Sequence, residues 1–115
     1  MKKVTLKLND DQIKVIQLAL SHQFHVIHTG LDKITHTNFI DGIIILDLLN
    51  YLFFKLRNVF EKPTPKKGLK TLTITTSTAA VVLQQLKKAT PEDIYSNSTI
   101  LKIIGEIDQQ LKNIF

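Results

Sequence analysis

The sequence contains no cysteine, and it has only four glycines and three prolines in 115 residues. Without cysteine, the protein has no disulfide bond, no thiolate metal site and no cysteine nucleophile. The four glycines are not clustered, which argues against a loop that cradles nucleotide phosphates. The Gly-x-Ser-x-Gly, His-Glu-x-x-His and paired-carboxylate patterns of common enzymes do not occur either. We therefore expect a protein that is not an enzyme and that carries no cofactor.

Arginine is nearly absent, because the basic residues are fourteen lysines and the single Arg57. The net charge of +5 favours anionic partners non-specifically. Arginine, however, is the residue suited to bidentate contact with phosphates and guanine edges. The composition is 43% hydrophobic and 22% charged, which is ordinary for a globular protein. The length predicts one domain, residues 1–115, with its own core.

No segment predicts a membrane span or a secretory leader. Residues 40–54 include eleven apolar side chains in fifteen positions, whereas a span needs about 20 apolar residues. Asp41, Asp47 and Asn50 also interrupt this run. The first ten residues, MKKVTLKLND, turn polar before the apolar part of a signal peptide develops. We expect a cytoplasmic protein without a membrane partner.

A strand that leads directly into a helix is predicted near the N-terminus. The segment VTLKLN, residues 4–9, alternates apolar and polar side chains, as a half-buried strand does. Asn9 can cap the following helix, and Gln12 stands three residues later, as in a capping box. The predicted order is therefore a strand, then a helix.

The same design is repeated 66 residues later. The segment TLTITTSTAAVVLQQL can be laid over the earlier TLKLNDDQIKVIQLAL, with threonines and Ser77 as the capping candidates. The sequence thus predicts two similar strand-helix halves, residues 1–61 and 69–115. The basic segment 61–70, with two prolines and a glycine, joins them as a loop.

Between the two copies, residues 38 to about 61 predict one long helix with Asn38 as its N-cap. Its apolar residues cover nearly the whole circumference, so we expect it to be buried nearly all round. On this interpretation Asp47 and Asn50 are buried polar candidates, unless they are exposed at a boundary between packed helices or bonded to a lysine such as Lys33 or Lys55. The main buried stripe is predicted to consist of Ile45, Leu49, Leu52, Leu56 and Phe60.

One further main helix is predicted after the second strand-helix copy. Thr90, Pro91 and Asp93 form a start signal in which the threonine is the N-cap. The segment SNST is expected to interrupt that helix, and a last helix begins at about Thr99. The fold class is therefore α+β and mostly α. Its order is strand, helix, long helix, loop, strand, helix, helix, with two short strands packed on a helical core.

All four histidines lie within fifteen residues: His22, His25, His28 and His36. Three of them are spaced by three residues, and such steps drift by about 60° each around a helix. They share the polar side with Lys14 and diverge instead of converging on one ion. We therefore predict a solvated helix face and no metal. If a metal does bind, its candidate ligands are His22, His25 and His28.

Basic side chains gather on the predicted strands and on the loop between them. The candidates for contact with nucleic acid or another anion are Lys3, Thr5, Lys7, Lys62, Lys66, Lys67 and Lys70. The segment KVTLKLNDDQIKVI resembles the layout of ribbon-helix-helix DNA-binding proteins. In that family the polar face of a strand enters the major groove, and the resemblance implies this role for Lys3, Thr5 and Lys7 only.

The sequence favours a small non-enzymatic interaction protein that binds another macromolecule or itself, and the partners we expect are a second copy of the chain and another protein, with nucleic acid as the alternative. The alternatives are a DNA-binding regulator with a ribbon-helix-helix-like strand face and a metal-binding or small-ligand-binding module that uses the histidines. We also expect a homo-oligomer, most simply a dimer. It would be joined in part through strand edges, which can template another copy, or alternatively through helices.

Overall fold

The computed structural model describes residues 2–30, 36–65, 68–89, 91 and 93–115. It is mostly helical with a two-stranded antiparallel sheet, which confirms the predicted fold class. In chain order its elements are β1 (Lys3–Leu8), α1 (Asp10–Gly30), α2 (His36–Glu61), β2 (Lys70–Thr75), α3 (Thr76–Lys88) and α4 (Ile94–Ile114). Within the described residues, no helix has the length and apolar character needed to cross a membrane.

The two strands form a ribbon with one buried and one outward face. Leu6 is paired with Leu72 at the middle of the ribbon. The strict alternation of buried and exposed residues along β1 follows from the two-residue period of a strand. The apolar side chains of the inner face, Val4, Leu6, Leu8, Leu72 and Ile74, are all buried in the core.

Side-chain caps explain why each strand turns directly into a helix. Asn9 Oδ1 accepts a hydrogen bond from Gln12 N at 2.8 Å, and Gln12 Oε1 accepts one from Asn9 N at 3.0 Å. This reciprocal pair is the predicted capping box, and it is confirmed. At the second junction Thr75 Oγ1 accepts a hydrogen bond from Thr78 N at 3.3 Å, so a hydroxyl replaces the amide as cap.

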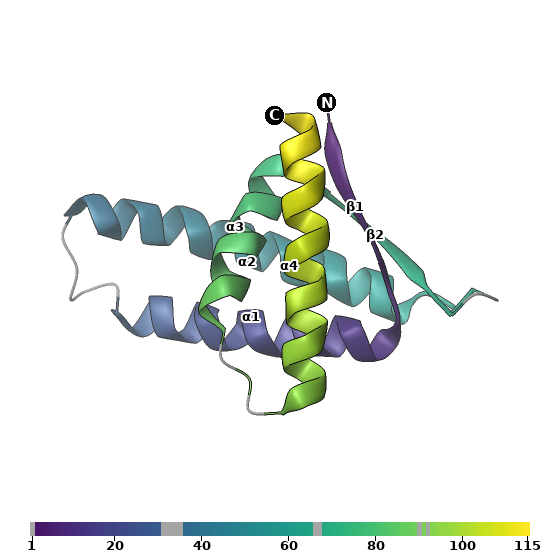
Figure 1. The fold of residues 1–115 in the computed structure, drawn as a ribbon. Helices are drawn as coiled ribbons and strands as arrows, with labels where there is room; N and C mark the ends of the chain where they lie inside the picture. The colour runs from purple at the N-terminus through teal and green to yellow at the C-terminus, as the bar shows by residue number, and fades with distance from the viewer. Residues whose placement is uncertain (1, 31–35, 66–67, 90, 92) are drawn as a thin grey trace.

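The order strand, helix, helix occurs twice, once in each half of the chain, and each half packs its second helix on the strand of the other half. The second helix of each half lies against the strand of the other half, α4 against β1 and α2 against β2. In Figure 1, α1 and α2 run side by side, and α3 and α4 cross in front of them. Core residues 66 positions apart correspond to one another: Leu6 and Leu72, Leu8 and Ile74, Ile13 and Ala79, Ile16 and Val82, Leu20 and Leu86.

Helix α2 supplies the centre of the core through one side only. Leu49, Leu52 and Leu56 are at most 1% exposed, as the predicted stripe requires. The opposite side is open, so the prediction of burial all round is wrong, and so is that of buried Asp47 and Asn50, which are exposed. The reason is tertiary: α2 packs mainly against α1, α3 and β2, and these neighbours cover one side of it.

Two helix boundaries also differ from the predicted ones. Helix α2 begins at His36 instead of just after Asn38. Helix α4 begins at Ile94, with Asp93 as its N-cap, and continues through Ser96 to Ser98 without interruption. The predicted cap Thr90 lies outside the described residues. A carboxylate that can reach the free N–H groups of the first turn outweighs the low helix propensity of the following serines and asparagine.

Candidate nucleic-acid interface

The outward face of the ribbon carries only lysine and threonine side chains. The register pairs Lys3 with Thr75, Thr5 with Thr73, and Lys7 with Thr71. The three β1 residues are exposed, and Thr73 and Thr75 are half-buried. Lys7 Nζ donates a hydrogen bond to Thr71 Oγ1 at 2.6 Å. The structure thus brings Lys3, Thr5 and Lys7 together on one polar surface, and β2 adds three hydroxyl groups to it.

Helix side chains occupy both edges of this ribbon. At the β1 edge, the side-chain amide of Gln110 donates to Thr5 O at 2.8 Å and accepts from Thr5 N at 3.0 Å. At the β2 edge, Lys55 Nζ donates to Thr73 O at 2.9 Å. These contacts replace bonds that another strand would make. No sequence pattern indicates either role, because Gln110 lies on an ordinary polar helix face and Lys55 on a long apolar helix.

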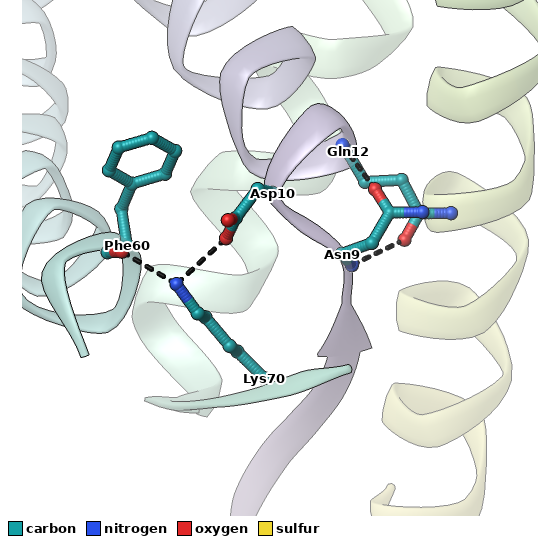
Figure 2. A network of polar contacts seen from close by, with 5 residues as sticks. All are labelled: Asn9, Asp10, Gln12, Phe60 and Lys70. Atoms are coloured by element: carbon teal, nitrogen blue, oxygen red, sulfur yellow. Dashed lines mark hydrogen bonds and ion pairs between the residues drawn. The ribbon is translucent and has the colours of Figure 1, made fainter. Parts of the chain in front are cut away.

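Lys70 does not belong to this polar surface, contrary to its place among the predicted anion contacts. Lys70 is only 5% exposed, because it occupies the inner face of β2 opposite Leu8. Its ammonium is 2.8 Å from Asp10 Oδ1 and donates to Phe60 O at 2.6 Å. It also lies 5.3 Å from the centroid of the Phe60 ring. Figure 2 shows it joining the start of α1 to the end of α2, beside the Asn9–Gln12 capping box.

The remaining predicted basic contacts lie in the loop before β2. Lys62 is exposed just after α2. The chain then turns at Gly68, whose φ of 72° is in the region that favours glycine. Lys66 and Lys67 lie outside the described residues. The described part of the basic surface therefore consists of Lys3 and Lys7 on the ribbon and Lys62 in the loop.

The histidines lie on the solvent side of α1, where His22, His25 and His28 are all exposed. The ring of His28 stacks on that of Phe24, with centroids 6.2 Å apart. The side chain of His36 lies outside the described residues. Across the described part of the chain, no three His, Asp or Glu side chains gather closely enough to hold a metal ion.

Two of these histidines line a shallow groove of about 730 Å³ between α1 and the start of α4. Asp93 on the opposite wall is committed to capping α4, since its Oδ2 accepts from Ser96 N at 2.7 Å. This backbone hydrogen bond from Ser96 holds the pKa of the Asp93 carboxyl below its ordinary value. The groove is lined by Lys14, Val15, Leu18, Ala19, Ser21, His22, His25, Ala89, Pro91, Asp93, Ser96 and Ile100.

Comparison with known proteins adds no functional information. No protein-family model matches the chain, and no curated protein and no solved structure matches it either.

Proposed function

We propose that the chain is a non-enzymatic binding protein and that the macromolecule it binds is double-stranded DNA. The observation that carries this proposal is the outward face of the ribbon. Its six side chains are lysine or threonine, and none is acidic. The major groove of B-DNA admits a two-stranded β-ribbon. A cytoplasmic location is part of the same proposal.

The chemistry of this face suits both parts of a DNA site. The ammonium groups of Lys3 and Lys7 can contact phosphates or the acceptor atoms of guanine, and threonine hydroxyls can both donate to and accept from base edges. Matching positions of the two strands carry different side chains, as with Lys7 and Thr73, 66 residues apart. The proposal therefore includes a DNA site whose two halves differ in sequence.

The crossed arrangement of the two halves supports the same proposal. The ribbon-helix-helix layout, which KVTLKLNDDQIKVI resembles, has a strand followed by two helices, and the helices of two units dimerise. Here one chain holds two such units and forms the ribbon between β1 and β2. The chain departs from the family pattern in the 21 residues of α1 and in having both units in one chain.

The experiment is a salt titration of binding to a fluorescent random-sequence duplex of about 30 base pairs, comparing the wild type with the Lys3→Ala/Lys7→Ala variant. Phosphate contacts make the logarithm of affinity fall linearly with the logarithm of salt concentration, with a slope of about −0.9 per contact. We expect the double variant to bind at least about tenfold more weakly at low salt, with a slope shallower by about 2.

The matched control is the Lys87→Ala/Lys88→Ala variant, which removes the same charge from the exposed last turn of α3. It should bind DNA as the wild type does, because these lysines are not on the ribbon. Equal losses in the two variants would show that only net charge attracts the DNA. Binding of the wild type that does not depend on salt, or no binding, would contradict the proposal.

A further inference from the structure

The exposed side of α2 presents an apolar surface interrupted by Asp47, which we call the α2 face. Its apolar members are all at least 38% exposed, and Phe54 reaches 69%. Alternating steps of four and three residues connect Ile40, Ile44, Asp47 and Tyr51, and then continue to Phe54, which is the spacing of a helix-pairing seam. The apolar members are Phe39, Ile40, Ile43, Ile44, Tyr51 and Phe54.

The fold itself does not require this face to be apolar. Helix α4 has the same place in the second half of the chain as α2 has in the first. Its buried residues Ile100, Ile103 and Ile107 follow Leu49, Leu52 and Leu56 at a constant distance of 51 residues. At the same distance, the positions of Tyr51, Phe54 and Asn58 are occupied in α4 by Lys102, Gly105 and Gln109, whereas those of Ile43 and Ile44 are occupied by Ile94 and Tyr95, which are also exposed. A polar surface is therefore compatible with the second half of this helix position, and the exposed Tyr51 and Phe54 of α2 need another explanation.

We infer that the α2 face binds a second copy of the same chain, with the two α2 helices antiparallel about a two-fold axis near the level of Leu49. The charges of α2 favour this orientation. Its first half carries the exposed carboxylates Asp41 and Asp47, whereas its second half carries Lys55 and Arg57 and a single carboxylate, Glu61, which lies 3.2 Å from Arg57. Antiparallel pairing places the acidic half of each helix along the basic half of the other, whereas parallel pairing would place Asp47 against its own copy.

The same register satisfies the other members of the seam. With the axis at residue 49, Ile44 lies opposite Phe54 of the second copy, and Asp47 lies opposite Tyr51. The tyrosine hydroxyl can then donate a hydrogen bond to the carboxylate, so the one acidic group within the seam has a partner. An isologous contact of this kind closes on itself and gives a dimer.

The size of the face is also that of a dimer interface. Three of the six side chains are aromatic, with about 150–250 Å² each, and the other three are the smaller isoleucines. All six are exposed by about half, which leaves about 500 Å² of apolar surface open to solvent. A standard interface buries about 800 Å² per partner, and the polar residues that flank the seam can supply the remainder.

The strand edges are a much less favourable binding site for a second copy. The outward N–H and C=O of Thr5 are bonded to Gln110, and Thr73 O is bonded to Lys55. A new strand at either edge would first have to displace these side chains. The α2 face requires no such displacement.

The first experiment measures the solution mass of the full chain by sedimentation across a range of concentrations. We expect a change from 13.1 kDa to twice that mass at about micromolar concentration. The Ile44→Glu/Phe54→Glu variant should remain a monomer at concentrations at least about 100-fold higher, because it places charges in the seam. A Leu101→Glu variant, which alters an equally accessible apolar residue of α4, should dimerise normally, and circular dichroism confirms that each variant is folded.

The second experiment tests the orientation and uses the absence of natural cysteine. Chains carrying Ile40→Cys are mixed with chains carrying Asn58→Cys and oxidised at low concentration. Antiparallel pairing predicts disulfides between the two kinds of chain, and parallel pairing predicts disulfides within each kind. The inference is overturned by a wild type that stays monomeric at all concentrations, by a dimer that Ile44→Glu/Phe54→Glu leaves intact, or by cross-links within each kind only.

Discussion

The buried ammonium of Lys70 provides the sharpest test of how the two halves of the chain are joined. Its two oxygen partners belong to the start of α1 and the end of α2, through Asp10 and Phe60. The Asp10→Ala substitution removes the only carboxylate that the structure places beside this cation within the described residues. The ammonium then keeps one neutral carbonyl and the face of an aromatic ring, at a site that is 5% exposed. We therefore expect a clear loss of stability.

The magnitude follows from three contributions. Removing one partner of a buried ion pair costs about 3–5 kcal/mol, and an aspartate in the first turn of a helix adds about 0.3–1 kcal/mol. The Asp10 side chain is 41% exposed, so solvent screens part of the attraction. Asp10→Ala should therefore lower the free energy of unfolding by about 2–3 kcal/mol. Lys70→Met should cost less, about 1 kcal/mol, because it leaves no unpaired buried charge.

The assay is urea denaturation of the two single variants, the double variant and the wild type. The double-mutant cycle should give a favourable coupling of about 1–2 kcal/mol between Asp10 and Lys70. The control is Asp11→Ala, since Asp11 has the same charge in the same helical turn but is exposed. If Asp10→Ala and Asp11→Ala differ by less than about 0.5 kcal/mol, the reasoning is refuted, because the carboxylate would then not be holding the buried cation.

Three further predictions concern the core, the histidines and the cap of α4. Leu49→Ala, at a fully buried position, should cost about 2–5 kcal/mol in urea denaturation, and a silent substitution would show that α2 is not central. Replacing His22, His25 and His28 together by glutamine should lower the free energy of unfolding by less than about 2 kcal/mol at pH 8, since ordinary surface changes cost about 0.5 kcal/mol each. A larger loss of stability in a thermal melt would mean that these histidines are buried. The hydrogen bond from Ser96 holds the pKa of Asp93 below the ordinary 3.8, so its capping contribution is complete above that pH and is lost as the pH falls through the lowered pKa. Melting temperatures of the wild type and Asp93→Asn should therefore differ at pH 7 and converge in strong acid, and a constant difference would contradict this.

The parts of the fold that could be predicted from the sequence depend on short-range rules. The alternation in VTLKLN places one face of β1 in the core because successive strand residues point to opposite sides. Asn9 and Gln12 form the predicted capping box because both groups lie within one helical turn. Leu49, Leu52 and Leu56 are buried because their spacing places them on one side of a helix. Each of these features involves neighbours in the chain.

The parts that could not be predicted depend on which distant element covers which surface. Lys70 looked like an exposed lysine of a basic loop, yet the register turns it inward, where Asp10 and Phe60 provide oxygen atoms. Gln110 lies 105 residues from Thr5 along the chain, and no local pattern marks it as the group that occupies a strand edge.

The sequence alone determined the order and kind of the main helices and strands of this protein, together with the polar face of its ribbon. Only the tertiary structure decided that α2 is buried on one side and open on the other. An apolar helix has the same sequence pattern whether neighbouring elements cover all of its sides or, as here, α1, α3 and β2 cover only one of them. The exposed positions of Asp47 and Asn50 follow from this missing neighbour. Local chemistry sets the periodicity of an element, whereas burial is a property of the whole arrangement of elements.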